Sequence, residues 1–274
     1  MIKRLARSPL SVIGALFIVA FVVMTVAAPL LATHDPMELS IAERLQPPST
    51  EHFLGTDVYG RDIYSRVLYG SRISVRVAVI GSLLAFFSGG LLGLVSGMAG
   101  GRVDNLLMRF ADVLLAFPGL LLAIGISAAL GTGETSIILA LWIVYLPRFA
   151  RLCRAAVLQV KGLDYVQAAR SMGARSSRVA LRHVGPNIVS PLIIQASVYF
   201  SEMILAEAAL SFLGLGAPPP TPSWGNILSE GRDFMRLAPW ISVFPGLFIL
   251  FSVLGINLFG DGLRDVLDPR DSGR

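Results

Sequence analysis

The stretch ISVRVAVIGSLLAFFSGGLLGLVSGM, residues 73–98, is long and apolar enough to cross a ~30 Å hydrocarbon layer as a helix, which takes about 20 residues. Small residues recur in it at every fourth position, so they follow one stripe of a helix with about 3.6 residues per turn. Such a stripe lets another helix approach closely. The stripe consists of Gly81, Ala85, Gly89, Gly93, Gly97 and, just beyond the quoted stretch, Gly101. We therefore expect a membrane helix in the core of a bundle.

Five further apolar blocks lie along the chain, at residues 10–31, 106–130, 136–157, 188–213 and 241–260. Of the 274 residues, 54% are hydrophobic and 15% charged, whereas soluble domains have roughly a quarter charged. The first block is longer than the ~7–15 apolar residues of a signal peptide, so it is expected to be retained as a helix. The sequence predicts an all-α membrane protein with six transmembrane helices.

Six spans place both ends of the chain on one side of the membrane. Lysines and arginines are concentrated at the two ends and in the connections after the second and fourth spans, and basic residues mark the cytoplasmic side. Both termini are therefore expected in the cytoplasm and the protein in the plasma membrane, the inner membrane of a two-membrane bacterium. The net charge of +5 is explained by this topology and does not indicate nucleic-acid binding.

This topology divides the chain into four expected parts. They are a tail with the first helix at 1–31, an extracytoplasmic loop at 32–72, a five-helix core at 73–264 and a cytoplasmic tail at 265–274. The core contains a hydrophilic segment at 161–187, on the expected cytoplasmic side. There, Asp164 is expected to cap a short helix, with Gln167 completing a capping box. Ala168 and Ala169 then leave a bare helix face that another protein can approach.

A glycine divides this hydrophilic segment into two predicted helices. Gly173 stands where a left-handed residue stops the first helix. The second helix is expected to begin at Ser176 or Ser177 and to end at Gly185 and Pro186. The alternative is an ordinary basic loop held against anionic lipid, which explains the charge but neither the short helix nor the glycine.

At this segment the chain resembles the permeases of binding-protein-dependent ABC importers of the dipeptide, oligopeptide and nickel class. Their loop motif reads Glu-Ala-Ala, three residues, Gly, nine residues, Ile-x-Leu-Pro. This chain keeps the spacing at Gln167, Ala168, Ala169, Gly173 and Pro186. Gln167 replaces the acidic residue, and His183 and Gly185 replace the two apolar ones. Together with Asp164 and Tyr165, these residues are expected to form the loop that couples the permease to its ATPase.

The resemblance covers nearly the whole chain, because further motifs of the class occur in family order. They lie at 55–57, 60–62, 65–66, 69–70, Arg72, 211–216, 222–225, 260–264 and 268–269. The resemblance implies the type I importer permease fold and a subunit that forms half of a pathway for di- or oligopeptides. It also implies a paralogous second permease, two ATP-binding subunits and an extracytoplasmic solute-binding protein as partners.

The energy for import is expected to come from the partner subunits. A P-loop needs Gly-x-x-x-x-Gly-Lys-Ser/Thr, and neither lysine of this chain, Lys3 or Lys161, stands in that context. ATP and Mg²⁺ are therefore expected on the ATP-binding chains, with no cofactor and no catalytic residue on this one.

Three acidic residues fall within the predicted spans, where ionisable groups are costly and are candidates for function. Asp112 follows Arg109 by three residues, so either an ion pair with it or a role in the pathway is expected. Glu202 and Glu207 are candidates for lining the pathway or for structural pairing. Their spacing places them about 140° apart on a helix, so the two are not expected to meet one ligand.

Prolines and histidines carry the remaining expectations. Pro118 and Pro147 should kink or break their helices. The three histidines, His34, His52 and His183, show no metal-ligand spacing, so no metal site is expected.

Two other function classes compete with an ATP-driven importer. An ion-gradient-driven transporter would have no use for the capped segment at 161–187, and an intramembrane enzyme would need a His-Glu-x-x-His or Gly-x-Ser-x-Gly pattern, which this chain does not contain. Nickel or another small solute remains open as the cargo.

Overall fold

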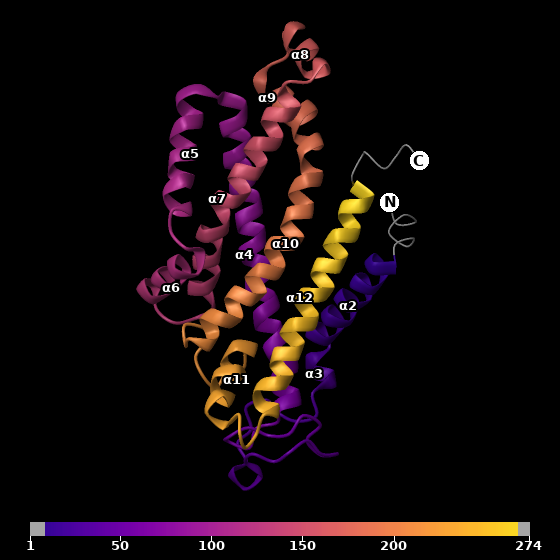
Figure 1. Ribbon diagram of the computed structural model, residues 1–274, viewed down its shortest axis with the longest axis vertical. Helices are drawn as coiled ribbons and strands as arrows, with labels where there is room; N and C mark the ends of the chain where they lie inside the picture. Colours follow the sequence, from indigo (N-terminus) through magenta and orange to yellow (C-terminus); the bar gives the residue numbers. More distant parts are fainter. Residues whose placement is uncertain (1–8, 268–274) are drawn as a thin grey trace.

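The computed structural model describes residues 9–267, so the chain ends at 1–8 and 268–274, with Lys3 and the motif at 268–269, lie outside it. The described residues form helices and loops without a strand (Figure 1). The helices are α2 (Pro9–Val26), α3 (Ala28–Leu31), η1 (Ile41–Glu43), α4 (Ile63–Ala99), α5 (Gly101–Leu115), α6 (Gly119–Leu130), α7 (Glu134–Lys161), α8 (Asp164–Ser171), α9 (Ser176–Arg178), η2 (Val179–Val184), α10 (Gly185–Phe212), α11 (Trp224–Gly231), η3 (Arg232–Phe234) and α12 (Trp240–Leu267).

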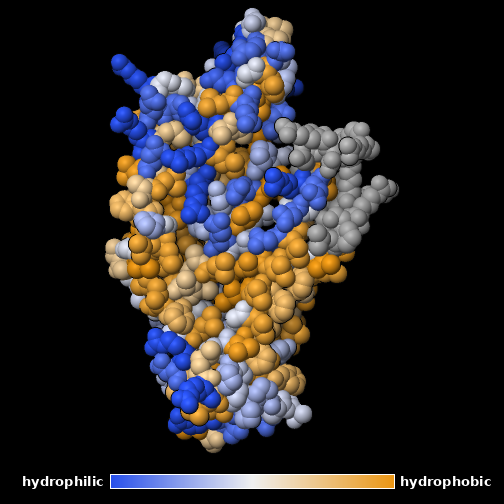
Figure 2. Space-filling view, viewed as in Figure 1, coloured by the Kyte–Doolittle hydropathy of each residue, from blue (hydrophilic) through white to orange (hydrophobic). Residues whose placement is uncertain are grey.

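Four helices are long and apolar enough to cross a membrane: α4, α7, the continuous helix Ser176–Phe212, and the helix Trp240–Val266 within α12. α5 and α6 meet the same criteria only as a bent pair, which makes up to five spans, and α2 contributes a shorter apolar helix. On the face shown in Figure 2, apolar side chains form a wide region across the middle, and hydrophilic side chains gather toward both ends. The predicted all-α membrane fold is confirmed, and the helix count agrees approximately with six.

The two ends of the molecule differ. At one end lie residues 32–62 and α11, which we call the loop end; at the other lies α8, which marks the α8 end (Figure 1). In the same view α2 and α12 run side by side, and α12 ends in the half of the molecule that carries α8.

The fold corrects the expected boundary between the first loop and the second span. We expected the loop to reach residue 72, but α4 begins at Ile63. The carboxylate of Asp62 caps it by accepting a hydrogen bond of 2.8 Å from the Ser65 amide. The extension contains two arginines, so the hydropathy pattern did not include it; Arg66 is buried among ion pairs, whereas Arg72 is exposed.

The third apolar block, residues 106–130, is divided at Pro118, which we expected to kink or break its helix. α5 and α6 meet at a bend of 87° around residues 116–118. Pro118 has no backbone N–H, so it cannot continue the α5 hydrogen-bond ladder, and its carbonyl starts α6 by accepting from the Leu122 amide. Pro147 is different, because α7 continues through it.

The glycine stripe of α4 lies against α7. A side chain at Gly89 would place its Cβ 2.5 Å from the carbonyl oxygen of Leu146, and one at Gly97 would lie 2.6 Å from Cγ1 of Val157. Gly93 is equally crowded by Ala150, and Ala85 is fully buried. These small residues let the two backbones approach as closely as they do.

Two members of the expected stripe differ from the rest. Gly81 has room for a Cβ, whose nearest neighbour would be the Met203 sulfur at 3.5 Å. Gly101 does not belong to the stripe at all, since α4 ends at Ala99. With a φ of +56° and open space around it, Gly101 is needed for the turn into α5 rather than for packing.

A buried ion-pair network holds the loop end together. Nε of Arg61 lies 2.6 Å from Oδ2 of Asp57, and Nη2 of the same arginine lies 2.6 Å from Oε2 of Glu230 on α11. Arg66 on α4 adds a contact of 2.9 Å to the same glutamate oxygen and is only 1% exposed. The motifs at 55–57, 60–62 and 65–66 thus tie the loop to α4 and α11.

Candidate functional site

The helix α8 projects beyond the ends of the long helices, at the tip of the molecule opposite the loop end (Figure 1). Its N-cap is Leu163, whose carbonyl accepts from the amides of Val166 and Gln167. Asp164 is therefore the first helical residue and makes no capping hydrogen bond, contrary to the expectation. The expected capping box is also absent, because Nε2 of Gln167 donates to the Lys161 carbonyl at 2.9 Å and so ties α8 back to α7.

Gly173 stops α8 in the left-handed conformation that the sequence indicated, with a φ of +81°. The Gly173 amide donates to the Arg170 carbonyl, and the Ala174 amide donates to the Ala169 carbonyl. This pair of bonds is a Schellman motif, which satisfies carbonyls at a helix end. A Cβ at Gly173 would meet nothing within 4 Å, so the backbone conformation, not lack of space, requires glycine here.

The two faces of α8 have different roles. Val166 and Ala169 are buried against the rest of the chain, whereas Asp164, Tyr165 and Ala168 are exposed. We expected both alanines to lie on one exposed helix face. Ala168 is exposed and open to an approaching molecule, but Ala169 is buried.

Large apolar side chains are exposed around this helix. Met172 is 82% exposed and Leu181 is 72% exposed, and Leu163 and Tyr165 are also exposed. Beside them is a hollow of about 600 Å³ next to Gly173, whose lining includes Arg175, Arg178 and Arg182. Exposed apolar groups bordered by charge are typical of a surface that binds another protein.

The segment is joined to the bundle by an unbroken helix. We expected Gly185 and Pro186 to end the second short helix, but α9, η2 and α10 run together from Ser176 to Phe212. The Gly185 amide donates to the carbonyl of Ala180, five residues back, so a π turn precedes the proline. Pro186 lies in the first turn of α10, where its missing N–H is tolerated.

A second polar network lies where α7 leads into α8. Arg154 binds Asp104 with two parallel contacts, Nε to Oδ1 at 2.6 Å and Nη2 to Oδ2 at 2.7 Å. The Ser96 hydroxyl also donates to this carboxylate, and Lys161 Nζ donates to the Gly97 carbonyl at 2.9 Å. These bonds tie α4, α5 and α7 together. Sequence reasoning missed them, because partners 50 residues apart leave no local pattern.

The three acidic residues of the spans have separate environments. Glu207 is fully buried and accepts hydrogen bonds from the hydroxyls of Ser74 at 2.6 Å and Ser211 at 2.7 Å, so it lines no open surface. Asp112 pairs with Arg151 on α7 instead of the expected Arg109.

Glu202 pairs with an arginine of α7. Its Oε2 lies 2.8 Å from Nη1 of Arg148, and both side chains are part exposed in the middle of their helices. The Arg148 guanidinium also lies over the ring of Tyr145 at 4.8 Å, with Tyr199 at 6.0 Å. This pair offers both signs of charge beside two aromatic rings.

One further cluster had no sequence signal. His34, His52 and Asp62 come together at the loop end, although the histidine spacing had suggested no such convergence.

Comparison with known proteins gives two family matches. Residues 89–272 match the family model described as binding-protein-dependent transport system inner membrane component. Residues 1–48 match the N-terminal transmembrane domain of oligopeptide transport permease C.

Several curated proteins are similar over nearly their full length. The dipeptide transport system permease protein DppC of Alkalihalophilus pseudofirmus is 42% identical, over 98% of this chain and 88% of the relative. The di/tripeptide transport system permease protein DppC of Pseudomonas aeruginosa is 45% identical, over 94% and 87%. The glutathione transport system permease protein GsiD of Pectobacterium atrosepticum is 42% identical, over 98% and 89%.

Among solved structures, the inward-facing MetNI methionine ABC transporter has a chain that superposes with a TM-score of 0.63. The match covers 75% of this chain and 98% of that chain at 15% identity, a likeness of fold alone.

Proposed function

Because this chain belongs to the family of binding-protein-dependent transport system inner membrane components, we propose that it is the half-pathway subunit of an ATP-driven importer of short peptides, coupled to its ATPase through α8. The observation that carries the proposal is the form of the α8 end. A short helix stops at Gly173 and has exposed apolar side chains around it, and it is followed closely by the helix Ser176–Phe212, which is long and apolar enough to cross a membrane.

The surface around α8 suits a protein partner with an apolar cleft and an acidic rim. Met172, Leu181 and Tyr165 supply exposed apolar area, and Arg175, Arg178 and Arg182 supply positive charge beside Gly173. We infer that the partner is an ATP-binding subunit. The complex would contain two such subunits carrying ATP and Mg²⁺, a paralogous permease and an extracytoplasmic solute-binding protein.

The connections of α8 suggest how motion passes into the membrane. Val166 packs in the same buried cluster as Val179 and Val184 of η2, and η2 continues directly into α10. On the other side, Gln167 bonds the end of α7, whose Lys161 and Arg154 hold α4 and α5. A displacement of α8 therefore moves α7 and α10 together, which is what rigid-body alternating access requires.

The orientation that goes with this function places the α8 end, with both chain termini, in the cytoplasm and the loop end outside. The basic side chains at 161–187 support this orientation by the positive-inside rule.

Short peptides are the proposed cargo. The relatives named above carry names for dipeptide, di/tripeptide and glutathione transport. A short peptide carries an ammonium and a carboxylate. Arg148 and Glu202, part exposed at mid-span and 2.8 Å apart, offer a partner for each. We infer that this pair lines the pathway.

The stop at Gly173 tests the coupling, with Gly214 as a matched control. Both glycines have a φ of +81°, both have open space around them, and both close a Schellman motif, Gly173 after α8 and Gly214 after α10. A valine at either site meets the same backbone strain of about 1–2 kcal/mol. Only Gly173→Val changes the direction in which the chain leaves α8, and so the position of α8 relative to the residues that follow it. It should therefore abolish coupled transport, whereas Gly214→Val should not.

The measurement is ATP-dependent uptake of a labelled dipeptide by the complete transporter in proteoliposomes. We expect at least a tenfold loss for Gly173→Val and near-normal uptake for Gly214→Val, with equal amounts of permease in the membrane. Equal uptake by the two variants would contradict the role of α8. Uptake by the unaltered transporter from a proton gradient without ATP would instead favour a secondary transporter, and capture of a peptide-free metal chelate by the cognate binding protein would contradict the cargo.

A further inference from the structure

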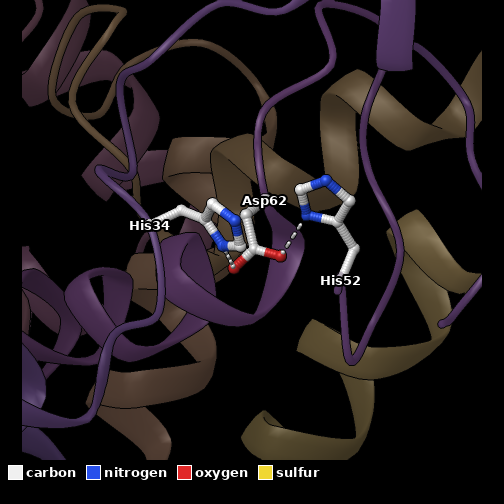
Figure 3. Close-up of side chains that lie close together, drawn as sticks. All are labelled: His34, His52 and Asp62. Atoms are coloured by element: carbon white, nitrogen blue, oxygen red, sulfur yellow. Dashed lines mark hydrogen bonds and ion pairs between the residues drawn. The ribbon is translucent and has the colours of Figure 1, made fainter. Parts of the chain in front are cut away.

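At the loop end, three side chains from separate parts of the chain point toward one another (Figure 3). His34 follows α3, His52 lies in the long loop, and Asp62 caps α4. The carboxylate is held between the two imidazoles: its Oδ1 lies 3.0 Å from Nδ1 of His52, and its Oδ2 lies 3.9 Å from Nδ1 of His34. One ligand atom from each residue lies within 4.8 Å of the others.

These separations are close to those of a metal site. Zinc binds nitrogen and oxygen ligands at about 2.0–2.2 Å in a tetrahedron, so its ligand atoms lie roughly 3.4 Å apart. The distance from Nδ1 of His52 to Oδ1 of Asp62, 3.0 Å, is slightly shorter than this, and the distance from Nδ1 of His34 to Oδ2 of Asp62, 3.9 Å, is slightly longer. Nδ1 of His34 lies 3.0 Å from the Thr33 hydroxyl, a contact that a bound ion would replace, and the side chain is 32% exposed.

A second, independent observation concerns the far side of the His52 ring. His52 is only 5% exposed, and its Nε2 has no hydrogen-bond partner among the described residues. A neutral imidazole has one donor and one acceptor nitrogen. If Nδ1 donates to Asp62, Nε2 is left as a buried acceptor that faces Oε2 of Glu43 at 3.8 Å, and two acceptors do not attract.

A metal ion on Nδ1 removes this conflict. Binding there leaves the proton on Nε2, which then points at the Glu43 carboxylate. Carboxylates commonly hold the second nitrogen of metal-bound histidines in this way. The ring is therefore placed as a metal ligand would be, with its outer partner already in position.

The surroundings attract a cation. The hollow beside the cluster is lined by Asp35, Glu38, Glu43 and Glu51 as well as Asp62, and neither lysine nor arginine is among its lining residues. Two imidazoles with one carboxylate favour Zn²⁺ and its transition-metal neighbours over Mg²⁺ or Ca²⁺, which prefer oxygen ligands. Three protein ligands leave the fourth position for water.

We propose that His34, His52 and Asp62 bind a divalent transition-metal ion of the Zn²⁺ class at the loop end. This replaces the sequence-based expectation that the chain has no metal site. The ion would join the segment after α3, the long loop and the first turn of α4 at one point, and so fasten the loop end to the membrane bundle.

The test uses the assembled transporter, purified with a tag that contains no histidine and stripped of metal with EDTA. Zn²⁺ is titrated by calorimetry, and Co²⁺ is used as a spectroscopic probe of tetrahedral nitrogen and oxygen ligands. Three variants are compared: His34→Gln, which removes a ligand while keeping a side chain of similar reach, Glu43→Gln, and His183→Gln, which removes a histidine at the other end of the molecule.

The unaltered transporter should bind one equivalent of Zn²⁺ per copy of this chain, and His34→Gln should bind it about 100-fold more weakly. Glu43→Gln should weaken binding about tenfold, and His183→Gln should not change it. At a Zn²⁺ concentration that saturates the unaltered site, added Zn²⁺ should raise the Tm of the unaltered transporter and of His183→Gln equally, that of Glu43→Gln less, and that of His34→Gln least. Equal binding by His34→Gln and the unaltered transporter, at equal metal-free Tm, would overturn the site, as would a Co²⁺ spectrum without tetrahedral bands.

Discussion

Buried ionisable residues in this protein depend on partners that lie far away in the sequence. Glu207 is held by the hydroxyl of Ser74, 133 residues away, and Arg66 is held by Glu230, 164 residues away. Leaving either group without its partners would bury an unsatisfied polar group or a charge, which is costly. At the scale of the residue, the position of an ionisable group in an apolar span predicts that it has a partner. The neighbouring sequence does not show which distant residue that partner is.

The first prediction at this scale concerns Glu230. Its replacement by alanine leaves Arg66, 1% exposed, without its nearest carboxylate. Breaking a buried pair in this way costs about 3–5 kcal/mol. The Tm of Glu230→Ala in detergent should therefore fall by several degrees or more.

Asp233→Ala is the matched control for that substitution. Asp233 lies three residues further on and pairs with Arg232 at the surface, where both side chains are more than half exposed. Exposed pairs contribute about 0–1 kcal/mol, so its Tm should hardly change. Similar Tm values for the two alanine variants would show that the network at Arg61 and Arg66 does not support the loop end.

At the scale of the element, the sequence predicts best what depends on neighbours along the chain. The left-handed stop at Gly173 and the break at Pro118 follow from single residues, since only a few residue types allow those backbone conformations. The failures were of two kinds. The N-cap of α8 was predicted at Asp164, one position after the observed N-cap, Leu163. The second span was predicted to begin at residue 73, because hydropathy does not show that Asp62 caps α4 or that Arg66 is buried.

The packing of α4 on α7 yields a prediction with an internal control. A side chain at Gly93 would collide with Ala150 and with Cβ of Cys153, while one at Gly90 would meet nothing within 4 Å. Gly93→Leu should therefore separate the two helices at a cost of about 1–3 kcal/mol or more, and Gly90→Leu should not.

The single cysteine of the chain reports the result. Cys153 is 1% exposed, so a maleimide should not label it in the unaltered protein or in Gly90→Leu. Rapid labelling in Gly93→Leu is the expected outcome. Slow labelling in both variants, with unchanged Tm, would mean that close approach of α4 and α7 is not required.

At the scale of the whole molecule, the two ends have separate tasks. The loop end is cross-braced by ion pairs among Asp57, Arg61, Arg66 and Glu230, whereas the α8 end has exposed apolar side chains and a basic hollow. A braced end and an open end, joined by helices that run the length of the molecule, suit a subunit that is moved from one side.

This division predicts which side each end faces. Met172→Cys introduces a thiol at a side chain that is 82% exposed at the α8 end, and Thr50→Cys introduces one at an exposed position at the loop end. In cells whose outer membrane has been removed but whose plasma membrane is intact, an impermeant maleimide should label Thr50→Cys at once. It should label Met172→Cys only after the plasma membrane has been permeabilised. Adding back ATP-binding subunits to the permeabilised membranes should protect Met172→Cys. Immediate labelling of Met172→Cys in intact cells would reverse the topology.

The groove that Gly89, Gly93 and Gly97 leave along α4 also has a consequence for biogenesis. The helix that fills it, α7, leaves the ribosome only after α5 and α6 have been made. The glycine face of α4 therefore cannot acquire its partner before translation has passed residue 161, the end of α7. Until that point this face has to be covered by something other than α7, and docking of α7 replaces that cover with protein.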